Sequence, residues 1–308
     1  MSSAPLQKIS IATVPPLTDP PFRWNIARRE QLGELLEGET EATYIGFQDD
    51  LIRACAQIVA SAGDANLVFL GRSPENLFDL SQGLLQNTSW QERTHLLPFS
   101  MHLYQWDCDL PTGTAMAAYR DYLETRALLP EQIAASGRVI AFADIVASGS
   151  TFHALIALLK RFSEESGVDW NAVRRKIRIV GVCRKEKTSP KTWRWQQHAP
   201  WLGNLMGGSH CVKNVSINGE LYHYLADYQP KTTSSYPSKC WGEPVCKEAV
   251  YKPRRLAALR FARALYEAGT SKQCRIAFAR ALSEQCAMRE PWLRHLVGEL
   301  KRSANGYG

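Results

Sequence analysis

Residues 138–151, RVIAFADIVASGST, decide the fold of this chain. The apolar run 139–142, continued by Ile145, predicts a fully buried strand, and the small residues that follow predict a tight turn. The helical spacing of apolar residues after Thr151 predicts a helix that extends to Glu165. A buried strand, a turn and a helix in this order form the unit from which parallel α/β sheets are built.

The same alternation continues on both sides of this unit. Short apolar runs predict further strands at 66–70, 95–99 and 176–182. Amphipathic spacing predicts helices at 25–37, 49–62, 75–85 and 115–127. We therefore predict an α/β fold with a Rossmann-like parallel sheet and right-handed crossovers.

The composition changes twice along the chain, which suggests three regions. They are an N-terminal arm and helix (1–46), an α/β domain (47–245) with an aromatic-rich cap at about 192–245, and a basic helical extension (246–308). Within the cap, Asn218-Gly219 predicts a hairpin between short strands at 212–217 and 221–225.

The turn within residues 138–151 has the composition of a phosphate-binding loop. Backbone N–H groups at a junction between strand and helix form a cradle at the positive end of the helix. Gly149 permits a close approach of the backbone, and the hydroxyls of Ser148, Ser150 and Thr151 add donors. Asp144 ends the strand, where open α/β sheets bind their ligands.

This segment resembles the ribose-phosphate loop of type I phosphoribosyltransferases, in which four apolar residues, two acids, four small or apolar residues and Gly-x-Thr follow one another. Residues 139–142 match the apolar run, and Asp144 matches the second acid. The resemblance implies that Asp144 is a catalytic residue that contacts the ribose hydroxyls. It also implies that residues 148–151 hold the 5′-phosphate of phosphoribosyl pyrophosphate (PRPP). An ordinary buried strand with a capped helix is the alternative.

The chain departs from the family pattern at Ala143, which replaces the first acid. One ribose contact is therefore missing. We expect an acid at this position to tighten ribose binding or raise turnover, provided that its side chain faces the crevice. The departure also permits a non-catalytic protein that binds PRPP or another nucleotide and acts as a regulator.

Two further segments are assigned from the order of elements in that family. The loop after the strand at 66–70 takes the place of the pyrophosphate loop, with Gly71, Arg72 and Ser73 as its binding residues. A plain helix with Ser73 as N-cap and Pro74 at its first position is an equal alternative. The turn-rich stretch 101–114 takes the place of the flexible loop, whose polar groups would be Tyr104, Asp107 and Asp109.

The resemblance implies transfer of phosphoribose from PRPP to a nitrogen acceptor, which the sequence does not identify, with release of pyrophosphate. Magnesium is implied as the ion that accompanies PRPP, and no direct protein ligand for it is predicted. The aromatic residues of the cap can stack a flat ring, but we expect most of them to form a small core. His153 is a candidate general base, although a lone helical histidine is more often structural.

The net charge of +7 lies in the C-terminal region, which has 13 Lys and Arg against 5 Glu from Lys247 onward. These basic helices suggest an alternative function in binding nucleic acid or protein. In the helix after Lys252, an apolar stripe that includes Leu259 and Leu265 is expected to dock on the body. The residues expected to face solvent are Arg255, Arg260 and Arg263.

The sequence predicts a cytoplasmic protein without a membrane partner. No stretch approaches about 18 apolar residues, and the N-terminus lacks the basic start and apolar core of a signal peptide. The eight cysteines include no CxxC pair, so we expect reduced thiols rather than a zinc site. The sequence is also compatible with a homo-oligomer, and it does not specify an oligomeric state.

Overall fold

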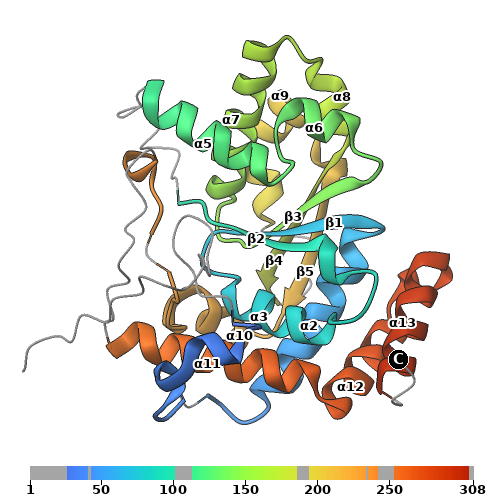
Figure 1. Ribbon diagram of the computed structural model, residues 1–308. Helices are drawn as coiled ribbons and strands as arrows, with labels where there is room; N and C mark the ends of the chain where they lie inside the picture. The colour runs from blue at the N-terminus through green and yellow to red at the C-terminus, as the bar shows by residue number, and fades with distance from the viewer. Residues whose placement is uncertain are drawn as a thin grey trace, which may run out of the picture.

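The computed structural model describes six stretches of the chain, which build a sheet with helices on both faces (Figure 1). These stretches are residues 26–40, 43–100, 113–185, 194–233, 235–241 and 253–304. The predicted flexible-loop residues Tyr104, Asp107 and Asp109 lie outside them.

All neighbouring strands of the sheet are parallel, and their order is β2-β1-β3-β4-β5. The strands are β1 (Ala65–Leu70), β2 (Thr94–Leu97), β3 (Val139–Ile145), β4 (Ile177–Arg184) and β5 (Val212–Ile217). The predicted α/β class with a parallel sheet is confirmed, and the architecture is consistent with a Rossmann-like fold. Because β1 connects to β2 on one side and β3 connects to β4 on the other, the topology reverses between β1 and β3.

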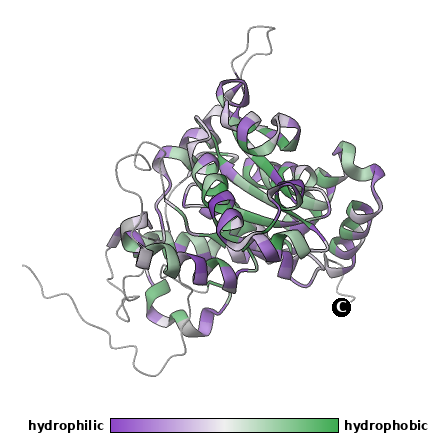
Figure 2. Cartoon of the chain, turned by 90° about the horizontal axis from the view of Figure 1, so that it is seen from above, coloured by the Kyte–Doolittle hydropathy of each residue, from purple (hydrophilic) through white to green (hydrophobic). Residues whose placement is uncertain are grey.

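Successive residues of each strand pack into two different hydrophobic clusters, one on each face of the sheet. Phe69 and Ala143 belong to one cluster, whereas Leu70 and Phe142 belong to the other. Both faces are buried, which explains why the strands read as continuous apolar runs. Figure 2 shows the strands in green between helices that turn many hydrophilic residues outward.

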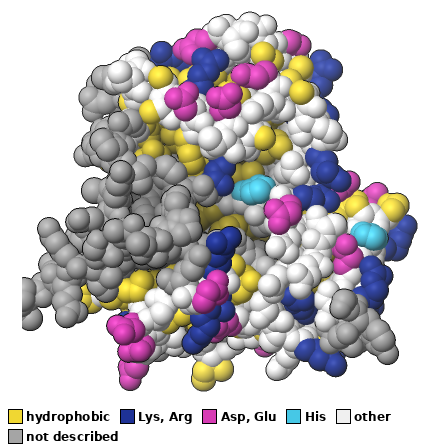
Figure 3. Space-filling model, viewed as in Figure 1, with side chains coloured by type: hydrophobic (Ala, Val, Ile, Leu, Met, Phe, Trp, Pro, Cys, Tyr) yellow, Lys and Arg dark blue, Asp and Glu magenta, His cyan; other side chains and the backbone are white. Residues whose placement is uncertain are grey.

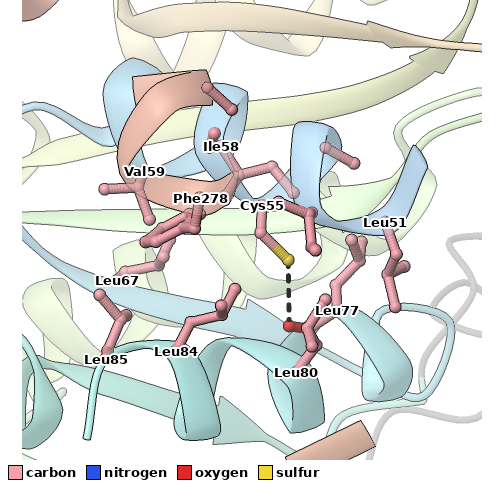
Figure 4. Packing of buried hydrophobic residues seen from close by; sticks show 14 of the residues in the cluster. Leu51, Cys55, Ile58, Val59, Leu67, Leu77, Leu80, Leu84, Leu85 and Phe278 are labelled. Carbon is pink, nitrogen blue, oxygen red and sulfur yellow. Dashed lines mark hydrogen bonds between the residues drawn. The ribbon is translucent and has the colours of Figure 1, made fainter. Parts of the chain in front are cut away.

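Five helices cover the face that receives Phe142. They are α5 (Gly113–Thr125), α6 (Pro130–Ala135), α7 (Ser150–Ser166), α8 (Trp170–Arg175) and α9 (Trp201–Met206). The opposite face is covered by α2 (Phe47–Ala62), α3 (Glu75–Leu84) and α10 (Gly219–His223). Figure 4 shows the seam between α2 and α3, where the Cys55 thiol of α2 reaches the carbonyl of Leu77 at 3.5 Å.

The first C-terminal helix packs on α3, the second packs on α2, and the third packs on the second, so that they form a further layer on that face (Figure 1). They are α11 (Pro253–Thr270), α12 (Lys272–Ser283) and α13 (Pro291–Ala304). Where α3 and α11 cross, a Cβ added at Gly83 would lie 2.1 Å from the carbonyl oxygen of Tyr266. A Cβ at Gly269 would lie 2.6 Å from the carbonyl oxygen of Leu80. The two backbones therefore touch, and no side chain fits between them.

Short helical segments complete the described chain, and no helix within it is long and apolar enough to cross a membrane. The segments are α1 (Arg29–Leu32), the 3₁₀ helices η1 (Gly33–Leu36), η2 (Gln91–Arg93), η3 (Trp195–His198), η4 (Ser209–Cys211), η6 (Ser238–Cys240) and η7 (Cys286–Arg289), and the π-helix η5 (Tyr224–Tyr228). Helix α1 with η1 replaces the single helix predicted at 25–37.

The predicted hairpin at Asn218-Gly219 is wrong. Strand β5 joins the sheet parallel to β4, and Asn218 caps α10, because its side-chain oxygen accepts a hydrogen bond from the N–H of Leu221 at 2.7 Å. Asparagine serves as a helix N-cap as readily as it occupies a hairpin turn, so the dipeptide alone does not separate the two structures.

The docking of α11 is confirmed, but none of the three arginines predicted to face solvent is fully exposed, since Arg255, Arg260 and Arg263 are each only partly exposed. Leu259 and Leu265 are buried against the body. The side chain of Arg263 is only 11% exposed. It bonds Glu267 at 2.8 Å, donates to the carbonyl of Ile26 and lies over the ring of Tyr266. Arg263 therefore attaches the N-terminal segment to α11 and is not part of a solvated face.

Candidate functional site

Two of the segments singled out from the sequence meet at one edge of the sheet. Strand β1 is followed by the loop Gly71–Ser73, and β3, which carries Asp144 as its last residue but one, is followed by the turn that opens α7. Because β1 and β3 are parallel neighbours, both loops lie at their carboxyl ends. This is also where the topology reverses, the position at which open α/β sheets form a ligand crevice.

The turn before α7 has the backbone conformation expected of an anion cradle. Gly149 occupies the N-cap position with φ +79°, a conformation that favours glycine. No side chain in the described structure caps the helix at this position. Ser148 is exposed, and Ser150 and Thr151 are partly exposed. The first N–H groups and the positive end of the helix dipole can therefore receive an anion.

Trp195 packs against Gly149 in the turn before α7. A Cβ added at Gly149 would lie 2.5 Å from the indole ring, which is buried and donates a hydrogen bond of 2.9 Å to Asn214. Trp201 is also buried and stacks on His153, with ring centroids 5.0 Å apart. These contacts bear out the expected core role for both tryptophans. Burial lowers the pKa of His153, which fits a structural role rather than a general base.

Asp144 lies near the carboxyl end of β3, next to the turn before α7. It is buried, and its Oδ1 accepts a hydrogen bond of 2.7 Å from the N–H of Ile145. Burial raises the pKa of Asp144 to about 8, while this N–H, the charge of Lys231 and the hydroxyl of Thr151 act in the opposite direction. A carboxyl group perturbed in this way at the end of a strand is a candidate for a functional residue.

Ala143 does not face the crevice. Its side chain is fully buried in the cluster that β1 and β4 share with the helices α2 and α3. Its neighbours in the sheet are Phe69 and Val180. The expectation that an acid here would reach the ribose required the opposite orientation, so that expectation is wrong.

The loop after β1 is held by Gln229, which the sequence did not reveal as a site residue. The Gln229 amide donates to the carbonyl oxygens of Arg72, at 3.1 Å, and Ser73. Its side chain is almost fully buried, and its Oε1 has no hydrogen-bond partner within the described residues. Among the residues that the structure describes, no acceptor bonds the backbone N–H groups of Arg72 and Ser73. Donors for an anion are therefore present on this loop.

The helix after this loop begins differently from the prediction. Pro74, not Ser73, is the N-cap of α3, and no side chain caps it. Glu75, the first residue of the helix, is buried and accepts hydrogen bonds from the N–H of Thr232 at 2.7 Å and from the hydroxyls of Thr232 and Thr233, each at 2.8 Å. These bonds fasten the segment after η5 to the start of α3.

Lys231 lies within that segment and was also missed from the sequence. Its Nζ donates a hydrogen bond of 3.0 Å to the carbonyl oxygen of Leu225. Burial lowers the pKa of Lys231 to about 8, against the charges of Glu75 and Asp144. No local spacing marks Lys231 or Gln229, because each acts on residues more than 80 positions earlier in the chain.

The described residues hold no cluster of three or more His, Cys, Asp or Glu side chains that could bind a metal ion. Of the buried carboxylates Glu75 and Asp144, the first is engaged by Thr232 and Thr233, which leaves Asp144 as the candidate contact for such an ion. A single carboxylate suits a magnesium ion that is held mainly by phosphate oxygens and water, and it does not suit a resident metal. The six described cysteines are free.

No family model matches this chain, and neither a curated protein nor a solved structure matches it.

Proposed function

We propose that this chain binds PRPP in the crevice between the loop after β1 and the turn before α7. The 5′-phosphate would lie on residues 148–151, the ribose hydroxyls on Asp144 and the pyrophosphate on residues 71–73. The observation that carries the proposal is the meeting of two helix-opening loops and a buried carboxylate where the sheet topology reverses.

The proposed reaction transfers phosphoribose to a nitrogen acceptor. A bond forms between the acceptor nitrogen and the anomeric carbon, the bond from this carbon to pyrophosphate oxygen breaks, and the acceptor proton passes to solvent. The sugar becomes cationic during the exchange, as in glycoside transfer. The ionised form of Asp144 would stabilise that charge, and the cradle at α7 would hold the sugar in position.

Magnesium would enter this site as part of the substrate, bound to the phosphate groups of PRPP. It neutralises the charge of the leaving group. The chain would contribute the carboxylate of Asp144 and the basic side chain of Arg72. The alternative, a regulator that binds PRPP without turnover, is supported by Ala143, because the position of the first acid in the family pattern is apolar and buried here.

The test is binding of PRPP in the presence of magnesium, measured by calorimetry on the full chain. Thr151→Val removes a hydroxyl that the proposal places on the 5′-phosphate and that lowers the pKa of Asp144, and it keeps the shape of the side chain. It should weaken binding by about tenfold, because a hydrogen bond to a charged group contributes about 1.5 to 3 kcal/mol. Thr270→Val is the control, since its hydroxyl bonds a carbonyl on α11.

Turnover separates the enzyme from the regulator. Release of pyrophosphate with a panel of nitrogenous bases would identify a transferase, whereas binding of PRPP without release would identify a regulator. No binding of PRPP by the unmodified chain would refute the proposal.

A second candidate function, nucleic-acid binding, is favoured by the exposed basic residues of the last helices. In Figure 3 the Lys and Arg side chains lie along the edge that α12 and α13 form, with acidic residues among them. The exposed basic residues of this edge are Lys272, Arg280, Arg289, Arg294, Lys301 and Arg302. Retention on DNA or RNA that falls steeply with salt would support this function.

A further inference from the structure

Lys231 sits in the candidate site without a full set of partners. It lies between two anchored stretches of backbone, because Gln229 bonds the loop after β1 and Thr232 and Thr233 bond Glu75. The ammonium group has three N–H donors. The carbonyl of Leu225 is its one hydrogen-bond acceptor within the described residues. The position of this cation is therefore fixed by the fold, while most of its donors remain available.

Among the described residues, no carboxylate forms a hydrogen bond with Lys231, whose ammonium group bonds the carbonyl of Leu225. The charges of Glu75, Asp144 and Asp227 favour its protonated form and the charge of Arg72 opposes it. The carboxylate of Glu75 already accepts three hydrogen bonds from Thr232 and Thr233. Burial lowers the pKa of Lys231 in spite of these three carboxylates, because desolvation disfavours the charged ammonium group, and most of its N–H donors have no acceptor among the described residues. An anionic ligand would supply the missing partner.

We propose that Lys231 is the fixed cation that receives the pyrophosphate group of the ligand, together with the loop at residues 71–73. The inference rests on the proposed function and adds to it a binding residue from a distant part of the chain. It also implies that protein charge, rather than a metal held by protein carboxylates, neutralises much of the pyrophosphate. The site should therefore retain pyrophosphate when magnesium is removed.

Calorimetry on the full chain tests this inference with inorganic pyrophosphate, ribose 5-phosphate and PRPP, each with magnesium and with a chelator. Lys231→Met should weaken binding of pyrophosphate and PRPP by about tenfold or more, and binding of ribose 5-phosphate by less than about twofold. Lys231→Arg keeps the charge and should bind pyrophosphate more tightly than Lys231→Met. Lys176→Met is the matched control, because Lys176 is also half-buried and donates to one carbonyl, that of Ser136, at 2.9 Å.

A second measurement keeps the inference testable if Lys231→Met fails to fold. The unmodified chain is treated with an amine-acetylating reagent, with and without saturating pyrophosphate, and the modified lysines are identified by mass spectrometry. Pyrophosphate should protect Lys231 and leave Lys176 unaffected. Equal acetylation of Lys231 in both samples would overturn the inference.

The outcomes separate the inference from the proposed function. If PRPP binds the unmodified chain and a folded Lys231→Met with equal affinity, the proposed function stands and the inference fails. If pyrophosphate binds through Lys231 but neither ribose 5-phosphate nor PRPP binds, the inference stands for a pyrophosphate site and the proposed function fails. If none of the three ligands binds, both fail.

Discussion

Ala143→Asp tests the orientation of β3, which places Ala143 in the core and the next residue, Asp144, on the opposite face of the sheet. Ala143 is 0% exposed, and its sheet neighbours Phe69 and Val180 are apolar members of the same buried cluster. A carboxylate there has no partner, so folding should raise its pKa. A rise from about 3.9 to about 7 would cost about 4 kcal/mol at a pH of about 7.5. That is a large part of the roughly 5 to 15 kcal/mol that stabilises a typical domain.

The assay is urea denaturation followed by tryptophan fluorescence, with Ala143→Asn as the matched control. Asparagine has nearly the same shape and no charge, so the difference between the two variants isolates ionisation. Because the folded pKa is raised, the penalty is present above the unfolded pKa and disappears as the pH falls towards about 4. Equal stability of the two variants at every pH, or tighter PRPP binding by Ala143→Asp, would refute the buried orientation.

Three further predictions follow from packing and charge. Gly83→Ala should lower the free energy of unfolding by about 2 kcal/mol or more in the same urea assay, because the added Cβ meets the backbone of α11. Gly298→Ala is the control. Its Cβ would lie 3.5 Å from the flexible side chain of Arg302, so this variant should be as stable as the unmodified chain or more stable. The raised pKa of Asp144 makes its deprotonation unfavourable in the folded state. Asp144→Asn should therefore gain stability relative to the unmodified chain as the pH rises from about 4 to 8, by up to about 1.4 kcal/mol per pH unit. A constant difference between the two melting temperatures across this range would contradict the prediction. Arg263→Gln should lower the melting temperature, and the exposed Arg280→Gln should leave it nearly unchanged.

The five strands of the sheet and the longer helices α2, α3, α5 and α7 could be predicted within a few residues because they depend on local patterns, whereas the strand predicted at 221–225 is helical. Strand β3 was marked by its apolar run, and α7 by the spacing of its apolar residues. The turn with Gly149 was marked by small residues between them, and a positive φ is a property that glycine permits wherever it occurs. Local composition also placed Asp144 at the carboxyl end of the strand.

Local sequence patterns were enough to predict the α/β class and the turn between Asp144 and Thr151, because hydrophobic period, residue size and backbone freedom act over a few neighbouring residues. The cap that Asn218 forms on α10, the orientation of Ala143 towards the core and the proximity of Lys231 to Asp144 became visible only in the folded chain. Each of these depends on which elements become neighbours in space. Lys231 acts on Asp144 across 87 residues of chain. Such contacts form only when the sheet brings distant segments together, and no local pattern records them.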